Sequence, residues 1–222
     1  MLNRVSSLLL LVLLSCRGVQ AQDKELLPRV SFRGTCASPI VISSKAYNAS
    51  FKGVVDGGLT VNIRLFGNFS VGLGYKGTLM QAEDFYTKQR FLATKEQIHE
   101  GVLRLGVDRV TGPKGFLSIA LNVGYGLNKY TAVKAAQDSL NGRHPTEFTA
   151  AFIRPEISYN FKVEENFAFG VLLAYNMELA TFDPRMPCFD TYGDAALQYN
   201  KANMSWISFG FGFYYGLKKK KG

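Results

Sequence analysis

The chain has 222 residues, enough for one domain with a sizeable core, and 47% of them are hydrophobic. A mean hydropathy of 0.00 excludes both a bundle of membrane-spanning helices and a strongly polar, disordered chain. The formal net charge of +9 would suit either nucleic acid or an anionic lipid surface as a partner.

Residues 1–21 form a predicted signal peptide. A basic start precedes an aliphatic run at residues 8–14, which is too short to cross a bilayer as a helix. Val19-Gln20-Ala21 is a small-x-small cleavage site, so we expect the mature protein to begin at residue 22. The alternative is a lipoprotein signal, with Leu13-Leu14-Ser15 before Cys16. An exported protein does not meet nucleic acid in the cell, so its positive charge is better explained by outer-membrane lipid and lipopolysaccharide as partners.

The first strand of the mature chain has two possible positions. The preferred one is residues 27–34, with Phe32 facing outward and Arg33 inward, followed by a first long loop at 35–50. A long second strand then keeps Phe51 in outward phase with the residues that follow. In the alternative, residues 47–55 form the first strand, and a tight turn at Asp56-Gly57-Gly58 follows it.

Seven further strands are indicated by alternation of large apolar with small or polar residues, the period of a β-strand. They cover residues 59–65, 69–79, 103–107, 117–127, 153–161, 167–179 and 207–217. In the strand at 117–127, for example, Ile119 and Leu121 share the large face, and Ala120 and Asn122 the small one. Pro155 falls on the large face of its strand and donates no ladder hydrogen bond, so we expect a kink or bulge there.

The size of the side chains decides which face of each strand points outward. A soluble β-sandwich, the alternative class, would have to cover its solvent face with Gly and Ala, which would be unusual. A narrow barrel has room inside for small and polar groups, whereas lipid accepts large apolar ones. The sequence therefore predicts an all-β fold, an eight-stranded antiparallel up-and-down transmembrane β-barrel over residues 22–222, with ten strands as the alternative.

The connections alternate in length, and this predicts an orientation in the bacterial outer membrane. Short turns are expected at 67–68, 109–114 and 163–166, and long loops at 81–100, 129–147 and 181–203. Outer-membrane barrels have short periplasmic turns and long outer loops. The short turns and the basic C-terminal tail are therefore expected in the periplasm.

Charges of both signs occupy the inward phase of these strands. The predicted lumen charge network consists of Arg64, Lys76, Arg104, Asp108, Arg154, Glu156 and Glu178. Buried charges need partners, because an unpaired one costs several kcal/mol. We expect a salt-bridge network that fills the lumen, since eight strands enclose little more than their own side chains. The alternative is a narrow polar pore.

Two cysteines remain after signal cleavage, and the exported compartment permits a disulfide between them. If the first strand is 27–34, Cys36 lies at the outer rim and Cys188 in the loop before the last strand, so the two could pair. The sequence has no Cys/His spacing typical of a metal site, and we expect neither a metal nor a cofactor.

Catalysis is not expected, although a lipid A-modifying barrel enzyme is kept as an alternative. The two histidines, His99 and His144, are interpreted as loop or rim residues, and no spacing links either one to a serine and an acid as a triad. The last long loop has an apolar set that either binds an envelope protein partner or packs over the barrel mouth. This set is Phe182, Met186, Cys188, Phe189 and Tyr192.

Residues 57–77 carry a family resemblance: a strand from Gly57, a tight turn at Gly67-Asn68 before Phe69, and a second strand ending Tyr75-Lys76-Gly77. This layout resembles the small outer-membrane β-barrel family common in Bacteroidetes, which includes PorT-like proteins, and the strand pattern also resembles OmpA-type barrels. The resemblance implies a non-enzymatic, porin-like barrel that supports an envelope or secretion complex. The residues after the aromatic end at 213–215 depart from a simple C-terminal insertion signal.

Overall fold

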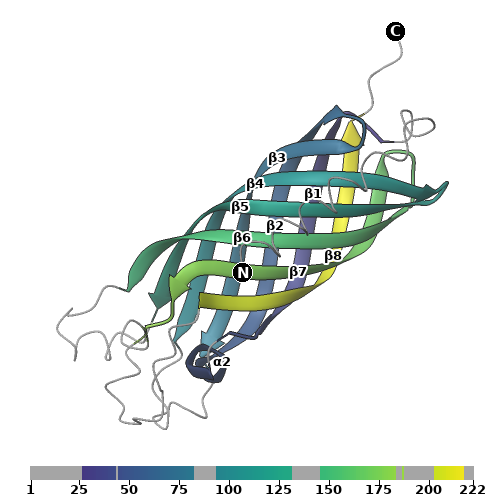
Figure 1. The fold of residues 1–222 in the computed structure, drawn as a ribbon. Coiled ribbons are helices and arrows are strands. Elements are labelled where there is room, and N and C mark those ends of the chain that lie inside the picture. Colours follow the sequence, from purple (N-terminus) through teal and green to yellow (C-terminus); the bar gives the residue numbers. More distant parts are fainter. Residues whose placement is uncertain are drawn as a thin grey trace, which may run out of the picture.

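The computed structural model describes residues 27–43, 45–82, 94–131, 146–183, 187 and 203–217. Each strand pairs antiparallel with the next and β8 pairs with β1, so the predicted eight-stranded barrel is confirmed (Figure 1). The strands are β1 (Val30–Val41), β2 (Phe51–Phe66), β3 (Phe69–Ala82), β4 (Lys95–Gly112), β5 (Gly115–Thr131), β6 (Glu147–Lys162), β7 (Phe167–Thr181) and β8 (Asn203–Leu217). A short helix, α2 (Lys45–Ser50), precedes β2. Among the described residues, no helix has the length and apolar character needed to cross a membrane.

The first strand was predicted to end too early. β1 continues to Val41 rather than stopping at residue 34, because residues 35–41 pair along their whole length with β8, up to Val41 opposite Trp206. Cys36 therefore lies in the middle of a strand, exposed on its outward face, and its expected position at the outer rim is wrong. The expected loop at 35–50 is reduced to a short connection that contains α2.

The second strand contains a bulge that the alternation did not show. Its register with β3 shifts between Gly53 and Val55, so one extra residue moves the preceding part of the strand to the opposite face. Phe51 was predicted to face outward and is instead buried inside the barrel. Gly53 permits the close approach of β1 there, since a Cβ at this position would lie 1.9 Å from the carbonyl oxygen of Pro39.

The strands extend further toward the long connections than predicted. β4 begins at Lys95, so residues 95–100 belong to a strand and not to a loop. The turn at 67–68 is confirmed, and Gly67 there has a φ of 51°. Pro155 lies on the exposed face as predicted. The register with β7 is the same on both sides of it, so the expected bulge is wrong, but the pairing is interrupted there, because Arg154 and Pro155 have no partner on β7.

The two faces of each strand have the predicted character. In β5, Ala120 and Asn122 are buried inside the barrel, whereas Ile119 and Leu121 are exposed on its outside. The same holds elsewhere, with Leu59 and Leu73 more than 60% exposed. A continuous apolar exterior is the surface that lipid requires of a closed barrel.

Candidate functional site

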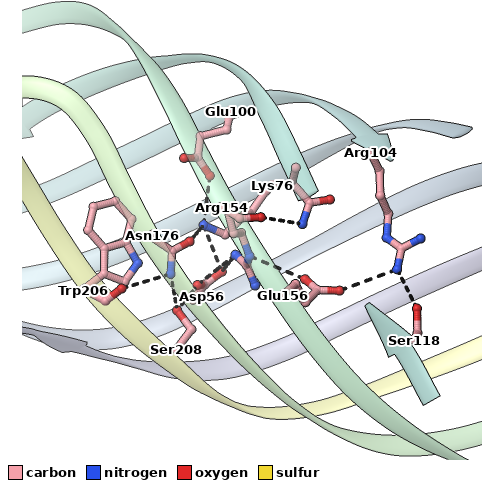
Figure 2. Close-up of polar contacts among 11 residues, drawn as sticks. Asp56, Lys76, Glu100, Arg104, Ser118, Arg154, Glu156, Asn176, Trp206 and Ser208 are labelled. Atoms are coloured by element: carbon pink, nitrogen blue, oxygen red, sulfur yellow. Dashed lines mark hydrogen bonds and ion pairs between the residues drawn. The ribbon is translucent and has the colours of Figure 1, made fainter. Parts of the chain in front are cut away.

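The centre of the barrel is organised around Asp56, a buried carboxylate on β2. Its oxygens lie 3.1 and 3.2 Å from Nη1 of Arg154, which reaches across from β6. Lys76 of β3 places its Nζ 3.4 Å from the same carboxylate, and the hydroxyl of Ser208 donates a hydrogen bond to it. Asp56 thus joins four strands through one side chain (Figure 2).

Lys76 extends this group toward β4 and β7. Its Nζ lies 2.9 Å from Oε2 of Glu100 and donates to Oδ1 of Asn176 at 2.9 Å. The amide of Asn176 then donates to the hydroxyl of Ser208 at 2.9 Å. Each of these groups is at most 4% exposed, so its partners are provided by the protein interior.

A second group of charges continues toward the short-turn end of the barrel. Glu156 lies 3.5 Å from Nε of Arg154 and 3.9 Å from Nη2 of Arg104. Ser118 accepts hydrogen bonds from Arg104 at 2.9 Å and from Arg33 at 3.0 Å. Arg33 then forms the shortest ion pair of the lumen, 2.6 Å from Asp108. We call the group formed by Arg33, Asp56, Lys76, Glu100, Arg104, Asp108, Arg154 and Glu156 the central network.

Five of the seven residues predicted to form the lumen charge network lie in the central network: Lys76, Arg104, Asp108, Arg154 and Glu156. The other two lie outside it. Arg64 is half-buried near the short-turn end, and its guanidinium donates to the backbone carbonyl of Leu27. Glu178 is fully buried nearer the long connections and accepts a hydrogen bond from Asn128 at 2.8 Å.

Sequence reasoning missed three buried acids. Asp56 was interpreted within a possible tight turn, and Glu96 and Glu100 within a loop. The signal for the last two was present in the sequence, because extending the inward phase of Arg104 backwards in steps of two gives Glu100 and then Glu96. The position of Asp56 depends on β2 being one long strand, which the Asp-Gly-Gly sequence does not favour.

The mouth of the barrel on the side of α2 is closed by buried aromatic residues. Tyr47 from α2 packs against Phe51 and Phe182, with ring centroids 5.6 and 5.2 Å away. Phe51 lies 5.8 Å from the ring of Tyr130, and Trp206 belongs to the same buried cluster. We call these five aromatic residues the cap. Phe182 therefore packs over the mouth, which was one of the two possibilities left open for its loop, whereas Met186, Cys188, Phe189 and Tyr192 lie outside the described residues.

Two acids lie in the lumen near the cap, and we call Glu96 and Glu178 the outer acids. The hydroxyl of Tyr47 donates to Oε2 of Glu96 at 2.6 Å. Burial is the main cause that raises the pKa of the Tyr47 hydroxyl well above its usual value, and the nearby Glu96 raises it further. The hydroxyl therefore remains a proton donor. Among the described residues, no cation lies within ion-pair distance of either outer acid.

The lumen holds a small cavity beside the central network. A cavity of about 40 Å³ lies among Arg33, Lys76, Arg104, Arg154 and Glu156. That volume holds roughly three water molecules at about 10–15 Å³ each. No group of three or more His, Cys, Asp or Glu side chains in the described part of the chain could hold a metal ion. Chemically, the arrangement pairs buried charges of opposite sign across the barrel.

The remaining predicted residues lie away from the lumen or outside the described residues. Cys36 is exposed on the outward face of β1, and Cys188 lies outside the described residues, so the predicted pairing is not tested. His99 is on the outward face of β4 and not in a loop, where its Nδ1 is hydrogen-bonded to the hydroxyl of Tyr75. His144, the signal peptide and the basic tail also lie outside the described residues.

Comparison with known proteins supports the fold. No family model and no curated protein matches the sequence. Neisserial surface protein A has a similar structure, with a TM-score of 0.50, 11% sequence identity, and coverage of 85% of this chain and 97% of that one. Ail of Yersinia pestis (TM-score 0.45, 11% identity, 85% and 99% covered) and OprG of Pseudomonas aeruginosa (0.45, 12%, 86% and 98%) also match. The closed eight-stranded barrel and its apolar exterior are those of a transmembrane β-barrel of the bacterial outer-membrane type.

Proposed function

We propose that this protein is a sealed, non-enzymatic barrel of the bacterial outer membrane whose long loops bind an envelope partner. The observation that carries this proposal is the double closure of the lumen. The central network crosses the barrel, and the cap covers the mouth beside α2. A barrel closed in this way offers no route for a solute, so interaction with other molecules is left to the loops.

The orientation follows from the lengths of the connections. Two-residue and four-residue turns join β2 to β3 and β6 to β7, and the described C-terminal strand ends on the same side (Figure 1). The long connections and α2 are at the other end of the barrel. We infer that this end faces the cell exterior, as in other outer-membrane barrels. A supporting role in an envelope or secretion complex, as in PorT-like proteins of Bacteroidetes, would use these loops.

Lipid A modification is the alternative, and a specific variant tests it. His99 lies on the lipid-facing surface, but among the described residues its side chain is hydrogen-bonded to Tyr75, which does not complete a triad. His99→Ala and His144→Ala should leave the acyl pattern of lipid A in whole cells unchanged. If expression of the wild-type gene changes the acyl pattern of lipid A, and either variant fails to do so, the protein is an enzyme and the proposal is wrong.

Limited proteolysis of intact cells tests the location and the orientation together. The wild-type protein should fractionate with the outer membrane, and external protease should cut within residues 83–93, 132–145 or 188–202. A protease site engineered into the turn at 67–68 serves as the control and should stay protected until the membrane is opened. Cleavage at 67–68 in intact cells, or recovery of the protein in a soluble fraction, would contradict the proposal.

A further inference from the structure

Charged side chains on the outward face of the described strands gather at the two ends of the barrel. At the long-connection end they are Lys52 of β2, Lys95 of β4, Lys129 of β5 and Glu147 of β6. At the short-turn end, the outward positions of β4 end with Arg109. Between these levels the exterior is apolar, as in the run Leu103, Leu105 and Val107 of β4.

The three lysines lie on β2, β4 and β5, within a run of four consecutive strands. Gln81 of β3 pairs with Lys52 on one side and with Lys95 on the other. Lys95 also pairs with Thr131 of β5, and Lys129 lies two residues before Thr131 on that strand. Strand spacing places Lys52 about 10 Å from Lys95, and a diagonal position places Lys129 about 7–8 Å from Lys95. Their flexible stems allow the ammonium groups to converge further. We call Lys52, Lys95 and Lys129 the lysine patch.

The lysine patch borders the apolar surface at the level of a membrane interface. Tyr75 and Tyr125 are 52% and 75% exposed and both lie opposite Gly101, six residues along β4 from Lys95, and His99 is hydrogen-bonded to Tyr75. From Lys95 to Arg109 a tilted strand rises about 35 Å, close to the thickness of the hydrocarbon core plus part of the headgroup layers. The lysines are therefore at headgroup height.

Charge in the patch is incompletely balanced by the protein. Lys129 is 2.6 Å from Glu147, and both side chains are about half exposed. In the part of the chain that the structure describes, neither Lys52 nor Lys95 forms an ion pair. The patch thus carries excess positive charge where an anionic headgroup would meet it, directly above lipid-facing side chains.

We propose that the lysine patch binds the phosphate groups of a lipid in the outer leaflet, a phosphorylated glycolipid of the lipid A type. The acyl chains of that lipid would lie on the apolar surface below, beside Tyr75 and Tyr125. Glu147 competes with the phosphate for Lys129 and weakens the site. The assignment to the outer leaflet rests on the orientation proposed above.

Native mass spectrometry of the purified protein in detergent tests the site, with lipid A as the probe and phosphatidylcholine as the neutral comparison. The triple variant K52Q/K95Q/K129Q should bind lipid A about a hundredfold more weakly, since each lysine near a charged surface contributes about 1 kcal/mol. Glu147→Gln should bind it more tightly than the wild type. Arg109→Gln combined with Lys114→Gln removes two cations from the opposite end and should leave binding unchanged.

Heat-dependent gel mobility confirms that each variant is a folded barrel before binding is compared. Equal retention of lipid A by the wild type and the folded triple variant would overturn the proposal, and so would an equal loss in the control at the short-turn end. Retention in detergent does not depend on orientation in the cell. The patch could therefore bind lipid A in detergent even if proteolysis showed that the long loops face the periplasm. That pair of results would refute the proposed function and leave the binding site standing.

Discussion

The two halves of the lumen hold their charges in different ways. In the central network, carboxylates meet cations directly, with Arg33 2.6 Å from Asp108 and Arg154 3.1 Å from Asp56. Under the cap, each outer acid accepts a hydrogen bond from a neutral group, Glu96 from Tyr47 and Glu178 from Asn128. The difference shows that the central half joins strands through opposite charges, whereas the outer half depends on packing and neutral hydrogen bonds.

The largest expected effect is at Asp56, because two cations depend on it. Asp56→Asn keeps the shape but leaves Lys76 and Arg154 without their shared carboxylate. We expect the free energy of unfolding to fall by about 3–5 kcal/mol, the cost of a buried charge that loses its partner. Urea titration of the protein in lipid vesicles measures this change. Glu147→Gln, at an exposed pair, is the control and should cost at most about 1 kcal/mol.

The Arg33–Asp108 pair gives a somewhat smaller effect that a second substitution should reverse in part. Arg33→Gln leaves Asp108 buried without its cation and should cost about 3 kcal/mol in the free energy of unfolding. Adding Asp108→Asn removes the orphaned charge, so the double variant should be more stable than Arg33→Gln alone. If the two substitutions instead add independently in urea titration, the central network does not act through paired charges.

A substitution of an outer acid should have a much smaller effect. Glu178→Gln keeps an oxygen that can accept from the amide of Asn128, and no described cation loses a partner. The free energy of unfolding should change by about 1 kcal/mol or less. A loss as large as that of Asp56→Asn in the same titration would remove the distinction between the two halves of the lumen.

An effect of similar size is expected when only the hydroxyl of Tyr47 is removed from the cap. Tyr47→Phe keeps the ring that packs on Phe51 and Phe182 and removes only the hydroxyl that donates to Glu96. This should cost about 1 kcal/mol, the net value of one hydrogen bond. Tyr47→Ala, which also removes the packing, provides the comparison and should cost about 3–5 kcal/mol. Equal losses for both variants would show that the hydroxyl, and not the aromatic contact, holds the cap in place.

Sequence alternation predicted the fold and most of the lumen, because large groups outside and small ones inside follow directly from lipid contact and lumen width. Lys76, Arg104 and Arg154 were placed on the inward face on that basis, and all three are buried. The partners of these residues could not be predicted. Pairing across the barrel depends on the register of distant strands, which alternation within one strand does not specify.

Other errors came from local irregularities of the chain. The bulge near Gly53 reverses the face of Phe51, and nothing in the alternation marks an inserted residue. Five of the six residues at 95–100 are polar or charged, so the segment resembled a loop, although Glu96 and Glu100 are buried in the lumen. The inward face of this part of β4 carries charges, and its outward face enters the headgroup region. Neither face is therefore uniformly apolar, and the alternation that marks the other strands is missing.

Planar-bilayer conductance of the purified wild-type protein tests the central claim, that the lumen is closed. The central network and the cap are proposed to close the lumen, so the folded barrel should give no stable conductance steps. Reconstitution is verified by heat-dependent gel mobility of the same sample. Reproducible single-channel steps from that sample would contradict the sealed lumen and establish the protein as a pore.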